Sequence, residues 1–177
     1  MRRTLRRVAT VKALVLTVSD RVSRGETEDR SGPAAMERLG ALGFATELRV
    51  VPDGISSVQD ALEGAVAEGF DLVVTTGGTG FSARDLTPEA TRSVVERLAP
   101  GIAEAIRSAT FDSNPYGMLS RGVAGITGST LIVNLPGSVG GVTESLDVIA
   151  PALGHAIALL RDEPAGHRVR HPPWTST

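Results

Sequence analysis

"DLVVTTGGTGFSARDLTPEAT", residues 71–91, contains the end of one predicted element and the start of the next. Apolar and β-branched residues fill 72–76, which predicts a strand buried on both faces. Thr87 and Pro88 predict a helix start, with Thr87 as the N-cap and Pro88 at the first helical position. The connection, 77–86, is longer than the roughly two to six residues usual between a strand and a helix. A loop of this length with three glycines predicts a binding site.

Strand and helix patterns alternate on both sides of this stretch, from residue 12 to residue 98. This order predicts an α/β fold with a mostly parallel sheet covered by helices on both faces. The length of 177 residues favours a single domain. Strands are expected at 12–19, 45–51 and 72–76, and helices at 32–42 and 56–68, the second helix with Ser56 or Ser57 as its N-cap.

The remaining patterns complete the domain. A final helical pattern covers 139–161, and Pro151 is expected to kink or break that helix. We therefore expect a domain at 10–161, a basic arm at 1–9 and a polar, proline-containing tail at 162–177. Between 98 and 139 the sequence predicts a helix at 101–110 and a strand at 130–136 that pairs with 123–127 across a turn at 128–129.

Composition excludes several classes of function. A net charge of −2 predicts no broad field for polyanions, and 3% aromatic residues leave few rings for stacking nucleic-acid bases. The chain has no cysteine, which excludes thiolate catalysis and fits a cytoplasmic location. The longest apolar stretch, 152–160, is about half of the roughly 18 residues that a membrane span needs. We interpret the four arginines of the arm, Arg2, Arg3, Arg6 and Arg7, as a solvated terminus rather than a contact with nucleic acid or lipid.

Ligands of parallel α/β sheets bind outside the carboxyl ends of the strands. Polar residues and glycines follow each of the main predicted strands in this sequence. We therefore expect the loops at 19–20, 52–53, 77–85 and 135–141 to form one rim around a ligand.

The connection at 77–86, which we call the glycine loop, matches neither common nucleotide fingerprint, G-x-x-x-x-G-K-[ST] or G-x-G-x-x-G. Glycines nevertheless let backbone N–H groups approach an anion closely, and successive N–H groups form an anion-binding concavity. Thr75, Thr76 and Thr79 add hydroxyl donors. A single glycine would indicate only a tight turn, but three favour a cradle for a phosphate or a nucleotide.

Three aspartates follow predicted strands or precede a predicted helix. Asp85 could cap the helix, but Thr87 is the more natural cap and leaves Asp85 to face the loop. Asp53 taken alone is better explained by a Pro-Asp-Gly turn, and Asp20 is equally ambiguous. Two or three such carboxylates on one rim could hold Mg²⁺ together with substrate phosphates. That combination suits phosphoryl or nucleotidyl transfer.

Other chemistries fit less well. The histidines at 155, 167 and 171 lack metal-ligand spacing. Ser138, in "PGSVGG", lacks the G-x-S-x-G order of a hydrolase nucleophile. Ser120 and Arg121 could cap a helix or bind an oxyanion, and the residues alone leave both possibilities open.

Six motifs carry a resemblance to a known family: "LTVSD", "DRSGP", "VVPD", "TTGGTGFSARDLTPEAT", "MLSRGVAGITGSTLIVNLPGS" and "ALGHAI". In this order they resemble the molybdenum-cofactor biosynthesis family, in its molybdopterin adenylyltransferase (MogA/MoaB) branch. The resemblance covers about residues 10–161. It implies a three-layer α/β/α sandwich that assembles as a homotrimer, or a hexamer in some members.

The family's reaction transfers AMP from Mg-ATP to the terminal phosphate of molybdopterin. The resemblance implies that Asp53 and Asp85 are the essential aspartates and place Mg²⁺ through the phosphates, which favours the functional interpretation of Asp53 over the turn. It further implies that the nucleotide is bound by Thr76, Gly77, Gly78, Thr79, Gly80, Leu135, Pro136, Gly137 and Ser138.

The resemblance also implies a set of residues at the pterin or the oxyanion: Ser19, Asp20, Ser120, Arg121 and Thr110. At Thr110 some members have a serine, so the hydroxyl is retained. The adenylylated product would pass to the molybdate-inserting enzyme, a larger related protein. The main alternative is a catalytically silent molybdopterin-binding or scaffold paralogue.

Overall fold

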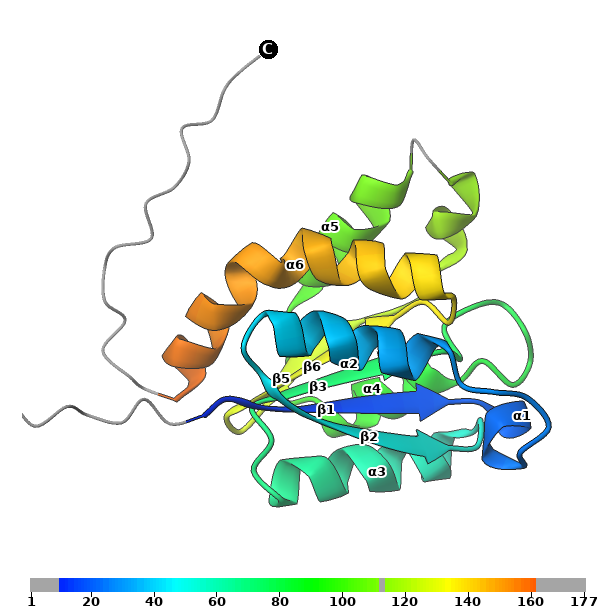
Figure 1. Cartoon of the computed structure of the whole chain (residues 1–177), viewed down its shortest axis with the longest axis horizontal. Coiled ribbons are helices and arrows are strands. Elements are labelled where there is room, and N and C mark those ends of the chain that lie inside the picture. Colours follow the sequence, from blue (N-terminus) through cyan, green and yellow to red (C-terminus); the bar gives the residue numbers. More distant parts are fainter. Residues whose placement is uncertain (1–9, 112–113, 162–177) are drawn as a thin grey trace, which may run out of the picture.

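The computed structural model describes residues 10–111 and 114–161. A central sheet has the strand order β2-β1-β3-β6-β5-β4, in which the first four strands are mutually parallel and the last two run antiparallel to their neighbours. Helices cover both faces, as Figure 1 shows. The predicted α/β sandwich is confirmed. The strands are β1 (Lys12–Val18), β2 (Ala45–Val51), β3 (Leu72–Thr76), β4 (Arg97–Leu98), β5 (Ala124–Thr127) and β6 (Thr130–Leu135).

The two faces of the sheet bury separate hydrophobic cores, because successive side chains of a strand point to opposite faces. In β1, Val15 packs in one core and Leu14 and Leu16 pack in the other. The first core lies under α2, α5 and α6, and the second lies under α3 and α4. The helices are α1 (Asp20–Ser23), α2 (Ser31–Ala41), α3 (Ile55–Ala67), α4 (Thr87–Val94), α5 (Pro100–Thr110) and α6 (Val139–Leu160), with a 3-10 helix η1 (Pro115–Leu119).

Two predicted helix caps are wrong. Thr87 is the first residue of α4 and Leu86 is the N-cap, because the Thr87 hydroxyl donates to Gly77 O (3.0 Å) and its N–H to Gly78 O (3.1 Å). Helix α3 is capped by Gly54, not by a serine. The Thr87 contacts fasten the start of α4 to the glycine loop.

Helix α6 is continuous through Pro151, so of the predicted kink or break the break does not occur, and Figure 1 shows the helix changing direction along its length. By length and composition alone it could cross a membrane. In the fold it is a core helix, because one of its faces is buried over the sheet through Leu146, Ile149, Leu153 and Ile157. The predicted arm and tail lie outside the described residues.

Candidate active site

Two cavities lie side by side at the carboxyl edge of the sheet, where the sequence predicts a rim. We name them after one lining residue each: the Tyr116 cavity, of about 580 Å³, and the Asp53 cavity, of about 470 Å³. Both are open to the surface. Their shared lining consists of Gly77, Gly78, Asp85, Gly137 and Ser138. A ligand in one cavity and a ligand in the other would therefore meet at the glycine loop.

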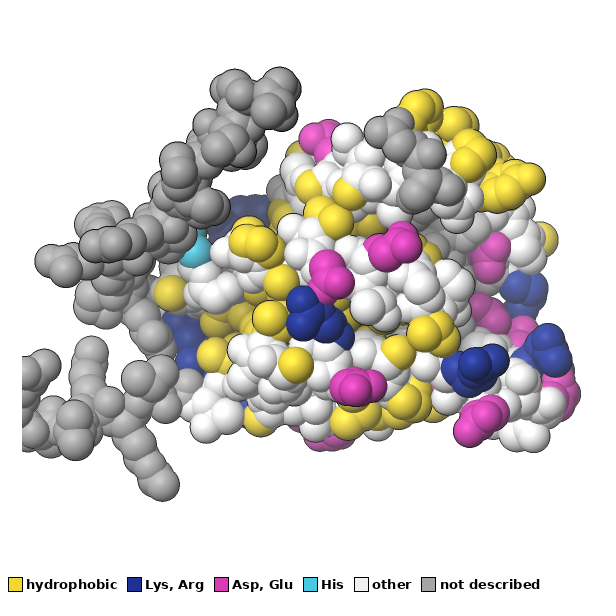
Figure 2. Space-filling view, turned by 45° about the horizontal axis from the view of Figure 1, so that its top comes forward, with side chains coloured by type: hydrophobic (Ala, Val, Ile, Leu, Met, Phe, Trp, Pro, Cys, Tyr) yellow, Lys and Arg dark blue, Asp and Glu magenta, His cyan; other side chains and the backbone are white. Residues whose placement is uncertain are grey.

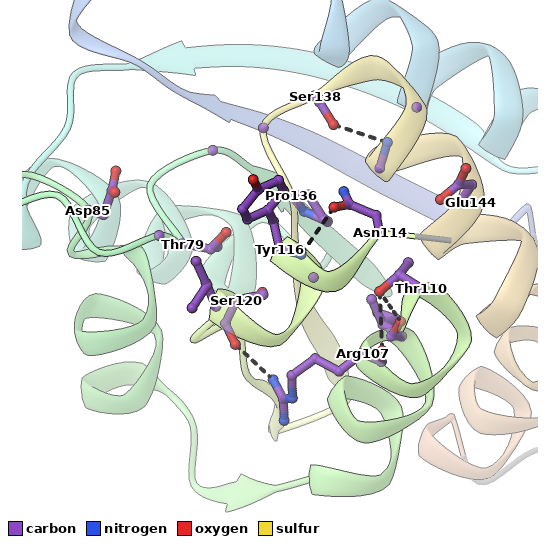
Figure 3. A pocket seen from close by; sticks show the side chains of 18 of the residues that line it. Thr79, Asp85, Arg107, Thr110, Asn114, Tyr116, Ser120, Pro136, Ser138 and Glu144 are labelled. Carbon is purple, nitrogen blue, oxygen red and sulfur yellow. Dashed lines mark hydrogen bonds between the residues drawn. The ribbon is translucent and has the colours of Figure 1, made fainter. Parts of the chain in front are cut away.

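The Tyr116 cavity lies between the glycine loop and the helices α5, η1 and α6, as Figure 3 shows. Thr110 and Ser120, both predicted from the sequence, contribute to its lining. Asn114, Tyr116 and Glu144 also line it, and none of them was predicted, because they follow no strand and belong to no recognised motif. The Asn114 side chain accepts from the Tyr116 N–H (3.1 Å) and so caps η1.

The Asp53 cavity lies between the ends of β1, β2 and β3 and the start of α2. Ser19, Asp53 and Thr76 were predicted, whereas Asp29 and Arg30 were quoted only as part of a motif. Asp29 fixes the start of α2: its carboxylate accepts from the Gly32 N–H (2.9 Å) and from the Thr17 hydroxyl (2.6 Å).

Asp53 is held by Asp20, the second residue after β1. Asp53 Oδ2 accepts from the Asp20 N–H (2.8 Å), and the Asp53 N–H donates to Asp20 Oδ1 (3.1 Å). From the glycine loop, the Arg84 guanidinium donates to both carboxylate oxygens of Asp20, at 3.0 and 3.1 Å. Asp20 thus lies beside Asp53 as its support and does not line either cavity.

Asp85 is folded back against its own loop. Its Oδ2 accepts from the Ser82 N–H (2.9 Å), and a Cβ on Gly80 would stand 2.9 Å from that oxygen. Among the residues that the structure describes, no donor reaches Oδ1 of Asp85 or Oδ1 of Asp53. Each carboxylate therefore keeps one oxygen for a ligand.

The donor set fits Mg²⁺ better than a tightly ligated metal. Within residues 10–111 and 114–161, no group of three or more His, Cys, Asp or Glu side chains is placed to hold a metal ion. Asp53 and Asp85, the two predicted carboxylates, line the same cavity. Mg²⁺ typically binds through one or two carboxylates, substrate phosphates and water, which matches this pair.

The glycines are required by close approaches of the backbone. Gly77 has φ +97°, and a Cβ there would stand 2.4 Å from Val18 O. Gly137 approaches from the loop after β6, so that its Cβ would stand 3.3 Å from Gly77 Cα. The Thr76 hydroxyl donates to Pro136 O (2.8 Å) and ties these two loops together. The wall between the cavities is therefore built from backbone in close contact.

The predicted pterin residues do not lie in one place. Ser19 lines the Asp53 cavity, whereas Thr110 and Ser120 line the Tyr116 cavity. Arg121 lines neither and instead contacts the backbone of the glycine loop. Of the predicted nucleotide residues, Leu135 is fully buried in the core and the others line one cavity or both.

Comparison with known proteins gives a consistent family. Residues 14–155 match the family model described as "Probable molybdopterin binding domain". Gephyrin of Dictyostelium discoideum is 41% identical over 161 residues, which cover 85% of this chain but only 22% of gephyrin. The molybdopterin adenylyltransferase of Helicobacter pylori is 40% identical over 157 residues, covering 85% of this chain and 88% of that protein.

Solved structures agree with this family. The crystal structure of the molybdopterin biosynthesis enzyme MoaB from Thermus thermophilus matches with a TM-score of 0.82 and 43% sequence identity, covering 88% of this chain and 99% of that one. The chain thus spans about a fifth of gephyrin and nearly all of this bacterial protein.

Proposed function

This chain belongs to the molybdopterin-binding domain family of molybdenum-cofactor biosynthesis, and from that membership we propose that it is a molybdopterin adenylyltransferase. It transfers AMP from Mg-ATP to the terminal phosphate of molybdopterin and releases pyrophosphate. The bacterial relative of similar length that carries this name supports the assignment, because the chain covers 88% of it.

The observation that carries the proposal is the pair of cavities with one shared wall. A transfer between two substrates needs two binding sites that meet at the transferred group. We assign the triphosphate and Mg²⁺ to the Asp53 cavity, since Asp53 and Asp85 both line it. We assign molybdopterin to the Tyr116 cavity, where an aromatic ring and the Asn114 amide suit a flat heterocycle with polar edges.

The chemistry needs positioning more than proton transfer. An oxygen of the molybdopterin phosphate, already anionic, forms a bond to the α-phosphorus, and the bond from that phosphorus to the oxygen bridging to the β-phosphate breaks. Pyrophosphate leaves with the electron pair, and no general base is required. Mg²⁺, when bound, would neutralise the triphosphate, and Asp53 and Asp85 would hold it. Gly77 and Gly78 line both cavities, and their backbone N–H groups would orient phosphate oxygens at the shared wall.

We further propose a cytoplasmic homotrimer, with a hexamer as the variant known in the family, that passes its product to a molybdate-inserting enzyme. Figure 2 shows hydrophobic side chains gathered at the tip of the molecule over α5 and η1. Phe111, Tyr116 and Met118 of this region expose 56%, 76% and 54% of their surface. An apolar surface of this kind is typical of an interface between subunits. Sedimentation of the full chain measures the assembly directly.

Pyrophosphate release from Mg-ATP, with and without purified molybdopterin, tests the activity. We expect release that depends on molybdopterin and is lost in Asp85→Asn, with molybdopterin binding retained. Asp60→Asn, which neutralises an exposed carboxylate on α3, is the matched control and should keep full activity. A folded wild-type protein that binds molybdopterin without releasing pyrophosphate would instead be a silent binding paralogue.

A further inference from the structure

Arg121 contacts three groups of the glycine loop and the helix that follows it. Its Nε donates to Gly80 O (2.8 Å), its Nη2 to Asp85 O, and its Nη1 to the Glu89 carboxylate. The Arg121 backbone N–H also donates to Thr79 O (2.9 Å). A planar guanidinium carries five N–H donors in a fixed fork, so it can bridge two carbonyls and a carboxylate at once.

The two carbonyls stand at the ends of one projecting segment. Gly80 and Asp85 enclose residues 81–84, all of which are exposed, and Phe81 exposes 70% of its surface. Arg121 therefore holds the two ends of this segment together. These contacts fix the backbone of Asp85, and with it the direction of the carboxylate that we assign to Mg²⁺.

Glu89 holds the guanidinium from the first turn of α4. Burial alone would raise the pKa of the Glu89 carboxyl, but hydrogen bonds from Arg121 and from the Glu89 backbone N–H, together with the charges of Arg121 and Arg92, outweigh it, and the pKa lies below its ordinary value. Glu89 is thus ionised at neutral pH. Its Oε2 is buried and has no partner among the described residues, and Arg121 binds the carboxylate through Oε1.

We propose that Arg121 and Glu89 form a clamp that positions Asp85, and that Arg121 acts on the reaction through the loop rather than by touching the pterin or its oxyanion. The observation behind the proposal is that the guanidinium is turned to the loop backbone and lines neither cavity. This inference rests on the proposed adenylyl transfer, because the consequence it describes is the placement of Asp85 for that reaction.

The kinetic test compares Arg121→Gln, Glu89→Gln and the double variant. We expect each single variant to lower kcat about 100-fold, the loss typical of a displacement of about 1 Å in a reacting group. The double variant should lose no more than either single one, because both remove the same clamp. Arg121→Lys should not restore kcat, since an ammonium cannot bridge both carbonyls. The dissociation constant for molybdopterin should stay at the wild-type value in all of them.

A raised dissociation constant for molybdopterin in Arg121→Gln, with Glu89→Gln unaffected, would overturn the clamp in favour of direct binding. Additive losses in the double variant would do the same. Arg92→Gln is the matched control: it removes an exposed arginine from the same helix, whose charge also acts on the Glu89 carboxylate, and it should leave kcat unchanged because the contacts with Gly80 O and Asp85 O belong to Arg121.

Amide hydrogen exchange supplies a readout that is independent of turnover. In Glu89→Gln we expect faster exchange confined to residues 80–86, with the strands protected as in the wild type. Unchanged exchange there would also overturn the clamp. If the wild-type chain releases no pyrophosphate, the proposed function fails, and the exchange measurement still decides whether the clamp exists.

Discussion

Asp20 and Asp53 bind each other reciprocally: the backbone N–H of each donates to the carboxylate of the other, at 2.8 and 3.1 Å. The two residues follow β1 and β2, which are neighbouring parallel strands paired from Lys12↔Ala45 to Val18↔Val51. The pairing therefore brings both aspartates to the same edge. The Asp20 N–H orients the Asp53 carboxylate, which is how the outer partners of metal ligands usually act.

We predict that Asp20→Ala weakens the use of Mg²⁺ without removing any residue that lines a cavity. Asp20→Ala keeps the backbone N–H that donates to the Asp53 carboxylate, but it removes the acceptor of the Asp53 N–H and the carboxylate that binds Arg84, so the backbone of Asp53 is held less firmly. The expected effect is a loss of about 10–100-fold in apparent Mg²⁺ affinity or activity. Titration of pyrophosphate release with Mg²⁺ measures it. Asp60→Ala is the control of equal charge, and an Asp20→Ala variant with a wild-type Mg²⁺ titration would contradict the supporting role.

We predict that Gly77→Ala destabilises the fold more than Gly25→Ala, although both glycines have positive φ. At Gly25, φ is +71° and a Cβ meets nothing within 4 Å, so Gly25→Ala should cost about 1 kcal/mol of backbone strain. At Gly77 the same strain is joined by the approach of Cβ to Val18 O, and the total should reach about 3 kcal/mol. Urea unfolding of both variants measures the difference. Equal losses would show that the Val18 carbonyl moves aside without penalty.

The sheet was predicted well because buried parallel strands and amphipathic helices leave strong periodic patterns in the sequence. That Asp53, Asp85 and the glycine loop share one rim was also predictable, since the rule for parallel sheets depends only on where strands end. Neither α1 nor β4, of four and two residues, was predicted, because they are too short to show a period. Thr87 was wrongly predicted as the N-cap of α4. Its hydroxyl donates instead to the carbonyl of Gly77, ten residues earlier in the chain, a contact that the local sequence does not indicate.

The division of the site into two cavities could not be predicted. It depends on η1 and α6 folding over the loop from distant parts of the chain, which brings Tyr116 and Glu144 to one cavity. Arg121 shows the same limit. An arginine beside a serine is compatible with oxyanion binding, but its contacts with Gly80 and Asp85 are set by tertiary packing alone.

We predict that Asn134→Ala destabilises the protein strongly, because it opens a buried polar network beneath the site. The Asn134 amide donates to the hydroxyls of Thr75 (3.0 Å) and Thr91 (2.9 Å), and its oxygen accepts from the Val123 N–H (3.1 Å). Leaving these partners buried without a hydrogen bond should cost about 3 kcal/mol. Thr143→Ala, which removes a solvent-exposed hydrogen bond within α6, is the control and should be nearly neutral. Urea unfolding compares the two, and a loss as small as the control's would mean that the network is dispensable.

We predict that the stabilisation from Glu89 depends on pH in the acid range. The pKa of the folded Glu89 carboxyl lies below its ordinary value of 4.5, so the unfolded chain binds its proton more readily than the folded one. The contribution is therefore fully present above about pH 4.5 and is lost as the pH falls through the lower folded pKa. Measured by urea unfolding, the difference in free energy between the wild type and Glu89→Gln should be constant near neutral pH and shrink below pH 4.5. Other carboxyls titrate in both proteins and cancel in the difference. A difference that grows as the pH falls would mean that Glu89 prefers its protonated form in the fold, and the ionic clamp with Arg121 would then be excluded.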